Sequence, residues 1–166
     1  MTYIMLTEDM NLLVTQADTI YQGDNLSKSI VFLIPNRVAE TDTISSDIFL
    51  TYVRPDGTPD ITILERDDVP YDDKYHRYVL PVTCKLSRFA GEVYFWIQVY
   101  AGNASNPIVA NSGECRLRIH KTGRPSGCFD DNQMTVLYQL KQQMESLSPS
   151  GMVEFSEEEI EELFAD

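Results

Sequence analysis

Hydrophobic and polar residues alternate with a period of two through most of residues 10–121. This is the spacing of a β-strand with one buried face, because successive side chains of a strand point to opposite sides. Turn-forming residues such as Gly23-Asp24-Asn25 and Pro55-Asp56-Gly57 interrupt the alternation. The pattern predicts seven or eight short strands, over residues 11–21 (as one strand or two), 26–34, 47–54, 61–64, 75–82, 91–100 and 108–120.

Short strands joined by polar turns indicate a two-layer, antiparallel β-sandwich. No segment between the strands shows helical periodicity, so a parallel sheet built from βαβ units is disfavoured. The inward-facing positions of the alternating segments give the expected core. We expect it to include Phe32, Ile48, Leu50, Leu80, Phe95, Ile97 and Leu117.

The hydrophobic spacing changes from strand-like to helical after Gly127. Asp130 or Asp131 can cap a helix N-terminus, and a helix is predicted over residues 132–147. Its apolar residues step by 3, 4 and 3, which is the seam of a coiled coil about two heptads long: Leu137, Leu140, Met144 and Leu147. A helix of this length is marginal alone, so it must pack on the sandwich or on copies of itself.

A second, short acidic helix is predicted within residues 150–166. Ser156 and Glu159 have the spacing of a capping box, and Phe155 and Ile160 that of a hydrophobic staple. The apolar face of this helix consists of Phe155, Ile160, Leu163 and Phe164. Two interpretations remain open: the helix folds back on the sandwich, or it docks into a groove of a neighbouring protein. The chain therefore divides into a β-sandwich domain, 1–128, and a helical, acidic extension, 129–166.

The net charge of −13 is concentrated in the C-terminal extension, which holds one Lys and 10 acidic residues. The absence of a cationic patch in the sequence argues against nucleic acid and against an anionic membrane surface as partners. No apolar run approaches the roughly 20 residues of a membrane-spanning helix. The N-terminus has neither the basic region nor the apolar core of a secretory signal, so we expect no signal-peptide export.

The sequence offers no recognisable catalytic constellation. His76 and His120 stand at the edges of predicted strands, and the motifs of hydrolases, zinc peptidases, dinucleotide sites and phosphate loops are absent. Cys84, Cys115 and Cys128 form no CxxC pair, and the first two are expected to be buried thiols. The acidic loop over residues 65–73 lacks EF-hand spacing, so a solvated loop is favoured over a cation site. We expect no enzymatic activity, no cofactor and no metal.

The strand over residues 91–100 carries an apolar stripe on one face and three aromatic residues on the other: Tyr94, Trp96 and Tyr100. Tyr and Trp combine a large apolar area with a polar tip, which suits an interface. Three explanations remain open: cover by the C-terminal helix, cover by another subunit, or stacking on a sugar. A second group for sugar stacking is Tyr71, Tyr75 and Tyr78.

Several motifs follow one another in a set order along residues 10–121. They are Gln22-Gly23-Asp24-Asn25 before the strand 30–35, Thr41-Asp42, the strand 48–52, Arg54-Pro55-Asp56-Gly57, Tyr78-Val79-Leu80-Pro81, Ala90-Gly91-Glu92-Val93, and a last strand ending in Arg116-Leu117-Arg118-Ile119. In their order and spacing they resemble the N-terminal immunoglobulin-like domain of the baseplate upper protein family, from tailed phages of Gram-positive bacteria.

The resemblance implies an immunoglobulin-like β-sandwich in a non-enzymatic structural protein of the virion, assembled in the host cytoplasm. Such a protein would be a baseplate or tail adaptor, or a capsid-attached fibre or decoration module. The implied partners are other virion proteins and further copies of the chain. The coiled-coil seam and the aromatic stripe lead us to expect self-association, with a trimer favoured. The expected interface residues are the three aromatic residues of strand 91–100 and the apolar residues of the two helices. The alternatives are a carbohydrate-binding module for host surface polysaccharide and an inhibitor that mimics acidic nucleic acid.

Overall fold

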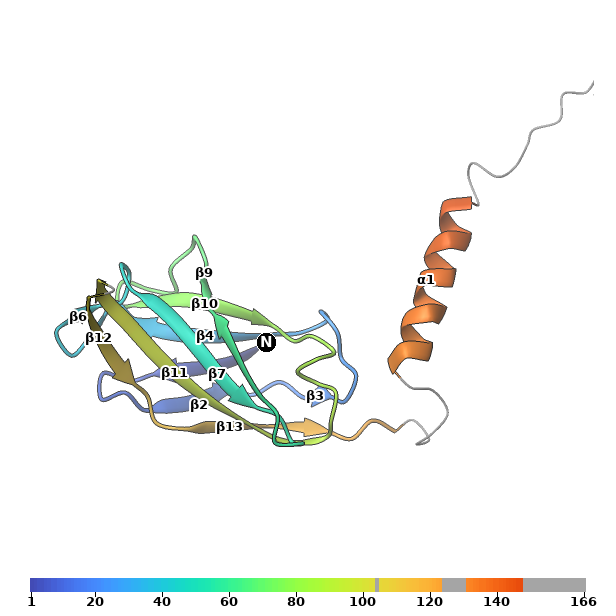
Figure 1. Cartoon of the computed structure of the whole chain (residues 1–166), viewed down its shortest axis with the longest axis horizontal. Helices are drawn as coiled ribbons and strands as arrows, with labels where there is room; N and C mark the ends of the chain where they lie inside the picture. The colour runs from blue at the N-terminus through green and yellow to red at the C-terminus, as the bar shows by residue number, and fades with distance from the viewer. Residues whose placement is uncertain (104, 124–130, 148–166) are drawn as a thin grey trace, which may run out of the picture. The chain divides into compact units, whose positions relative to one another are not determined.

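The computed structural model describes residues 1–103, 105–123 and 131–147 (Figure 1). The chain divides into two compact units, of which the first comprises residues 1–123 and the second contains the helix α1 (Asp131–Leu147). The domain boundary expected after residue 128 lies outside the described residues.

The first unit is a sandwich of two β-sheets (Figure 1). Sheet 1 has the strand order β2-β1-β4-β10-β9. Its strands are β1 (Thr2–Leu6), β2 (Leu12–Gln16), β4 (Ser29–Pro35), β9 (Glu65–Arg66) and β10 (Tyr75–Pro81). A small hairpin of β5 (Arg37–Val38) and β6 (Thr41–Asp42) follows β4.

Sheet 2 has the strand order β3-β13-β11-β7-β8, and β12 pairs with the second half of β11. Its strands are β3 (Ile20–Tyr21), β7 (Asp47–Val53), β8 (Pro59–Ile63), β11 (Gly91–Asn103), β12 (Asn106–Asn111) and β13 (Cys115–His120). The prediction of a mainly β sandwich followed by a C-terminal helix is confirmed. The sheets are mixed, however, because β1 runs parallel to β4 and β3 runs parallel to β13.

The core lies between the two sheets, and every residue expected there is buried except Leu80, which is partly buried. Phe32 of β4 and Phe95 of β11 meet edge to face, with ring centroids 6.1 Å apart. Aromatic pairs prefer this geometry, and this pair joins the two sheets at the centre of the core.

The segment 108–120 forms two strands where the sequence predicts one. The Ser112 hydroxyl accepts a hydrogen bond from the Ile97 amide at 2.8 Å, and the Gly113 amide donates to the Met10 carbonyl at 2.7 Å. The hydroxyl of Ser112 thus takes the place of a main-chain carbonyl opposite Ile97, and Gly113 bonds to the β1–β2 connection instead of to β11. The regular ladder is interrupted here, so β12 ends at Asn111 and β13 begins at Cys115. The interruption places a side-chain hydroxyl beside Trp96.

Two further differences concern β1 and Cys84. The strand β1 escapes the sequence pattern because Tyr3 and Met5, which alternate with buried Thr2, Ile4 and Leu6, are not polar enough to mark a solvent face. Cys84 is exposed, which contradicts the expected burial, because it lies beyond the end of β10 in the connection to β11. Cys115 is buried as expected, and burial raises the pKa of its thiol to about 12.

The predicted helix over residues 132–147 is confirmed as α1, which begins one residue earlier at Asp131. In the described part of the chain, no helix is long and apolar enough to cross a membrane. The second predicted helix, within 150–166, lies outside the described residues, as does the Asp130 cap.

Candidate functional site

The side of sheet 2 that faces away from the core carries an unusual share of apolar and aromatic residues. The strand register brings Trp96 of β11 opposite Thr51 of β7, and Thr51 opposite Ile61 of β8. Because side chains alternate along a strand, the neighbours of buried Leu50, Phe95 and Ile97 lie on this side. We call this surface the outer face; it includes Asp47, Phe49, Thr51, Val53, Ile61, Ile63, Glu92, Tyr94, Trp96, Gln98, Tyr100, Arg116 and Arg118.

The three aromatic residues expected from the sequence all lie on the outer face, but in two separate pairs. Tyr94 and Trp96 stack with ring centroids 6.3 Å apart and an interplanar angle of 27°. Tyr100 instead packs edge to face against Phe49, with centroids 4.9 Å apart. The outer face therefore presents a stacked pair at its centre and an edge-to-face pair toward the N-terminal end of β7.

The edge strand β8 adds two residues that the sequence does not single out. Ile61 and Ile63 are 60% and 56% exposed. A period-two pattern places both on one face of a strand, but it cannot tell whether that face meets the core or solvent. The register resolves the question, because Ile63 lies opposite Phe49 and Ile61 opposite Thr51, on the outer side of β7.

A hollow of about 300 Å³ lies beside Trp96. It is lined by Thr51, Trp96, Ile97, Gln98, Asn111 and Ser112. The Gln98 amide nitrogen donates to the Asn111 side-chain oxygen at 2.8 Å, which fixes one wall. The hollow sits where β12 gives way to β13, so the interruption of that edge helps to shape it. Its size suits one bulky side chain of a partner.

The two arginines of the outer face lie along β13. Arg116 lies opposite Tyr94, and Arg118 lies opposite Glu92. The Arg116 guanidinium is 3.7 Å from the Glu92 carboxylate, but their side chains are 66% and 44% exposed. A salt bridge this exposed contributes little to stability and leaves Arg116 available to another anion. The outer face therefore changes from aliphatic at β8, through aromatic at β11, to basic at β13.

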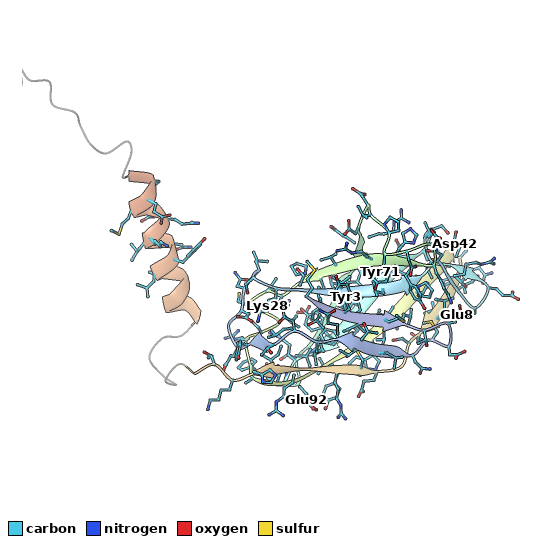
Figure 2. The ribbon with its side chains drawn as sticks, turned by 180° about the vertical axis from the view of Figure 1, so that it is seen from behind. Tyr3, Glu8, Lys28, Asp42, Tyr71 and Glu92 are labelled. Atoms are coloured by element: carbon cyan, nitrogen blue, oxygen red, sulfur yellow. The ribbon has the colours of Figure 1, made fainter. Side chains whose placement is uncertain are left out.

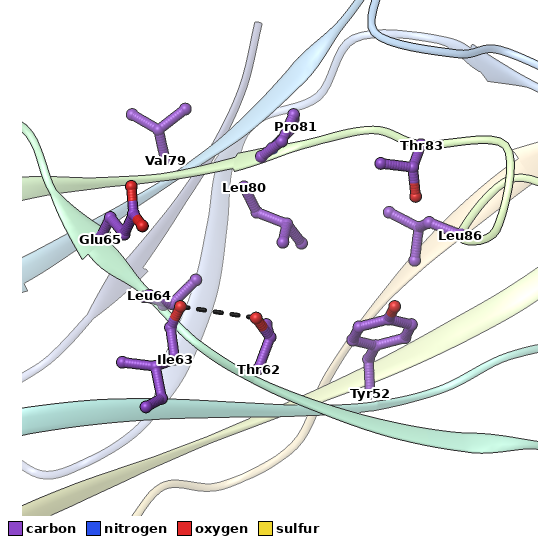
Figure 3. A pocket seen from close by; sticks show the side chains of 10 residues that line it. All are labelled: Tyr52, Thr62, Ile63, Leu64, Glu65, Val79, Leu80, Pro81, Thr83 and Leu86. Atoms are coloured by element: carbon purple, nitrogen blue, oxygen red, sulfur yellow. Dashed lines mark hydrogen bonds between the residues drawn. The ribbon is translucent and has the colours of Figure 1, made fainter.

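A second cavity, of about 360 Å³, opens between the sheets near β8 and β10 (Figure 3). Its lining combines aliphatic side chains with the hydroxyls of Tyr52, Thr62 and Thr83. The Tyr52 hydroxyl donates to the Asp60 carboxylate at 3.3 Å, and Lys85 forms an ion pair with the same carboxylate. Burial, with the adjacent Asp60 charge, raises the pKa of Tyr52 to about 12, and Lys85 lowers the pKa of Asp60. A phenol held protonated in this way serves as a structural donor.

The two histidines each contact a neighbouring side chain. The His76 ring hydrogen-bonds to the Asn36 side chain, and the His120 ring lies 6.1 Å from that of Tyr21. Among the described residues, no group of three or more His, Cys, Asp or Glu side chains is arranged to hold a metal ion.

The second tyrosine group does not form one surface for stacking on a sugar. Tyr78 is only 3% exposed, because its side chain belongs to the core. Exposed Tyr71 packs instead against Tyr3, with ring centroids 6.4 Å apart (Figure 2).

The seam residues of α1 are exposed. Leu137, Leu140 and Met144 are 47%, 50% and 71% exposed, respectively. The side chain of Leu147 lies outside the described part, as do Phe155, Ile160, Leu163 and Phe164.

Comparisons with known proteins give a structural similarity only. No model of a protein family matches the chain, and no curated protein matches it. The sandwich is similar to the N-terminal domain of phage TP901-1 ORF48. That likeness has a TM-score of 0.44 at 12% sequence identity, and it covers 72% of this chain and 94% of that domain. At this identity it concerns the fold alone.

Proposed function

We propose that the chain is a non-enzymatic structural protein of a phage virion that joins other virion proteins and further copies of itself. The observation that carries the proposal is the outer face, where Ile61, Ile63, Trp96 and Tyr100 lie on one side of sheet 2. Contiguous apolar surface of this kind marks a protein–protein contact, since leaving it in water costs free energy.

The assignment to a virion rests on the motif order within residues 10–121, which resembles the baseplate upper protein family. That resemblance favours a baseplate or tail adaptor, or a capsid-attached fibre or decoration module. The described residues offer the cavities and side-chain clusters noted above, and none of these pairs a nucleophile with a base. The outer face on a β-sandwich is best suited to binding other proteins.

Self-association is the second part of the proposal, with a trimer favoured. The seam of α1 exposes Leu137, Leu140 and Met144, which need a partner surface to be buried. A seam of two heptads cannot hold a coiled coil by itself, so contacts of the sandwich must add area.

Two measurements on the full-length protein test this proposal. Sedimentation at tens of micromolar is expected to show a species at a multiple of 18.9 kDa, with three copies favoured. Mass spectrometry of purified particles from the phage that carries the gene is expected to detect the protein. A monomer that is also absent from the particles would overturn the proposal.

A carbohydrate-binding module for host surface polysaccharide is the second candidate, and the stacked Tyr94–Trp96 pair favours it. Adjacent aromatic rings on a flat sheet face can stack against the apolar faces of sugar rings. Binding of bacterial surface glycans to the monomeric protein, abolished by Trp96→Ala, would support this candidate. Absence of glycan binding by a protein that self-associates would exclude it.

A further inference from the structure

We propose that the outer face binds the acidic C-terminal segment, residues 152–166, of a neighbouring copy of this protein. The inference rests on the proposed role in assembly and specifies which two surfaces meet. It would make the contact heterologous, since the tail of one copy meets the sheet of the next.

The apolar parts of the two surfaces match in kind. Ile160, Leu163 and Phe164 are spaced by three and four residues, so a helix would place them on one side. An amphipathic helix binds by laying such a side into an apolar groove. On the outer face, exposed Ile61 and Ile63 lie along one margin, and the hollow beside Trp96 offers room for one bulky side chain.

The charges of the two surfaces are also complementary. The segment has no basic residue and seven acidic ones: Glu154, Glu157, Glu158, Glu159, Glu161, Glu162 and Asp166. The outer face has Arg116 and Arg118 along its β13 margin. Two acidic residues share this face: Glu92, which already lies against Arg116, and Asp47 at the start of β7, opposite Tyr100. A helix with its apolar side toward β8 and its acids toward β13 would set apolar residues against Ile61 and Ile63 and acidic residues against the two arginines.

The charge pattern of the protein favours this segment as the occupant. The extension 129–166 contains a single base, Lys141, which lies 3.7 Å from Glu145 of its own helix. Within the protein, basic partners for the acids of the segment must therefore come from residues 1–128. Self-association through α1 would hold the segments and outer faces of several copies in one assembly and raise their effective concentration.

Trp96 provides a direct readout, because it is the single tryptophan of the sequence. The receptor is the full-length protein carrying Ile160→Ser, Leu163→Ser and Phe164→Ser, which disables its own segment. A peptide of residues 150–166 is titrated into it, and we expect a saturable blue shift of Trp96 emission that weakens as salt rises. A peptide of the same composition in scrambled order is expected to bind at least tenfold more weakly.

Substitutions in the receptor test the apolar and the charged contacts together. Ile61→Lys, together with Arg116→Glu and Arg118→Glu, is expected to weaken peptide binding at least tenfold. The control, Arg37→Glu on the β5–β6 hairpin, reverses an exposed charge elsewhere and should leave the affinity unchanged. Equal binding by all receptors, or by the scrambled peptide, would overturn the inference.

A complementation experiment shows whether the segment docks on another copy. The face variant carries Ile61→Lys, Arg116→Glu and Arg118→Glu with an intact segment, and the segment variant carries the three serine substitutions with an intact face. Both variants also carry Leu140→Glu, which removes association through α1, so we expect their mixture to contain a complex of the two that neither forms alone. If no mixed complex forms while the peptide binds, each segment docks on its own sandwich and the inference is wrong. A peptide that fails to bind a protein that still self-associates and enters particles removes this inference alone.

Discussion

Phe95 and Tyr94 follow one another on β11 and lie on opposite sides of sheet 2. Phe95 is 1% exposed, and its ring centroid lies 6.1 Å from that of Phe32 and 6.0 Å from that of Tyr52. We expect Phe95→Ala to lower the free energy of unfolding by about 3–5 kcal/mol, because it removes buried contacts and leaves a cavity. Tyr94→Ala, which loses only outer-face contacts, should cost under about 1 kcal/mol. Urea denaturation of both variants measures the difference, and equal losses would contradict the assignment of the faces.

The ionisation of Tyr52 makes the free energy of unfolding depend on pH in the alkaline range. Its pKa is about 12 in the folded protein, against about 10 for an exposed tyrosine, so the folded state retains a proton that the unfolded state releases. Its contribution to stability is therefore complete below pH 10 and falls as the pH rises from about 10 to 12. Burial raises the pKa values of Cys115 and Tyr78 in the same direction. We expect Tyr52→Phe to make the alkaline decline of the unfolding free energy shallower without abolishing it. Urea titrations between pH 8 and 11 measure this, and an unchanged slope would contradict the shifted pKa.

At the scale of the element, the start of β11 depends on a glycine. Gly91 has a φ of +135°, and a Cβ atom at this position would lie 2.9 Å from the Cβ of Pro55. We expect Gly91→Ala to destabilise the sandwich by about 1–3 kcal/mol, through backbone strain and through displacement of the Pro55 turn. Gly123→Ala is the control, because a Cβ there meets no atom within 4 Å. Thermal unfolding of the two variants should differ by several degrees, and similar melting temperatures would show that the turn adapts.

The seam of α1 makes a prediction about association. Leu140 is 50% exposed, at the centre of the seam, and we expect Leu140→Glu to shift the sedimenting species toward 18.9 kDa, because a charge cannot be buried in a coiled-coil seam. Gln139→Glu introduces the same charge at a neighbouring exposed position outside the seam and should leave the mass unchanged. If both variants keep the mass of the parent, α1 plays no part in self-association.

The elements that the sequence predicts well are those whose faces differ most in polarity. In β7, buried Ile48, Leu50 and Tyr52 alternate with less buried residues, so the pattern alone defines the strand. The division between β12 and β13 could not be foreseen, because it depends on Ser112 bonding to Ile97 and on Gly113 bonding to Met10, a contact distant in sequence. Two-residue strands such as β9 are likewise set by pairing with a neighbour and leave no periodic signal.

At the scale of the whole molecule, the same limit applies to the candidate site. The sequence places Tyr94, Trp96 and Tyr100 on one side of β11, and the structure agrees. It could not show that Ile61 extends this surface on one side and Arg116 on the other, because their adjacency follows from the order β13-β11-β7-β8. The strand register determines which residues of different strands lie side by side on a face of the sheet. The hydrophobic periodicity of the sequence shows only which residues of one strand share a face.

The terminal segment offers the last test, because folding back and docking on a neighbour depend differently on protein concentration. A segment that folds back on its own sandwich stabilises the protein equally at every concentration, whereas a segment bound to another copy stabilises it by mass action. We expect deletion of residues 152–166 to leave the melting temperature nearly unchanged at sub-micromolar concentration, where copies are apart. At tens of micromolar, the parent protein should melt several degrees higher than the deleted one. Differential scanning fluorimetry across this range measures both. A deletion that lowers the melting temperature equally at all concentrations would mean that the acidic segment completes its own sandwich and that the outer face must find a different partner.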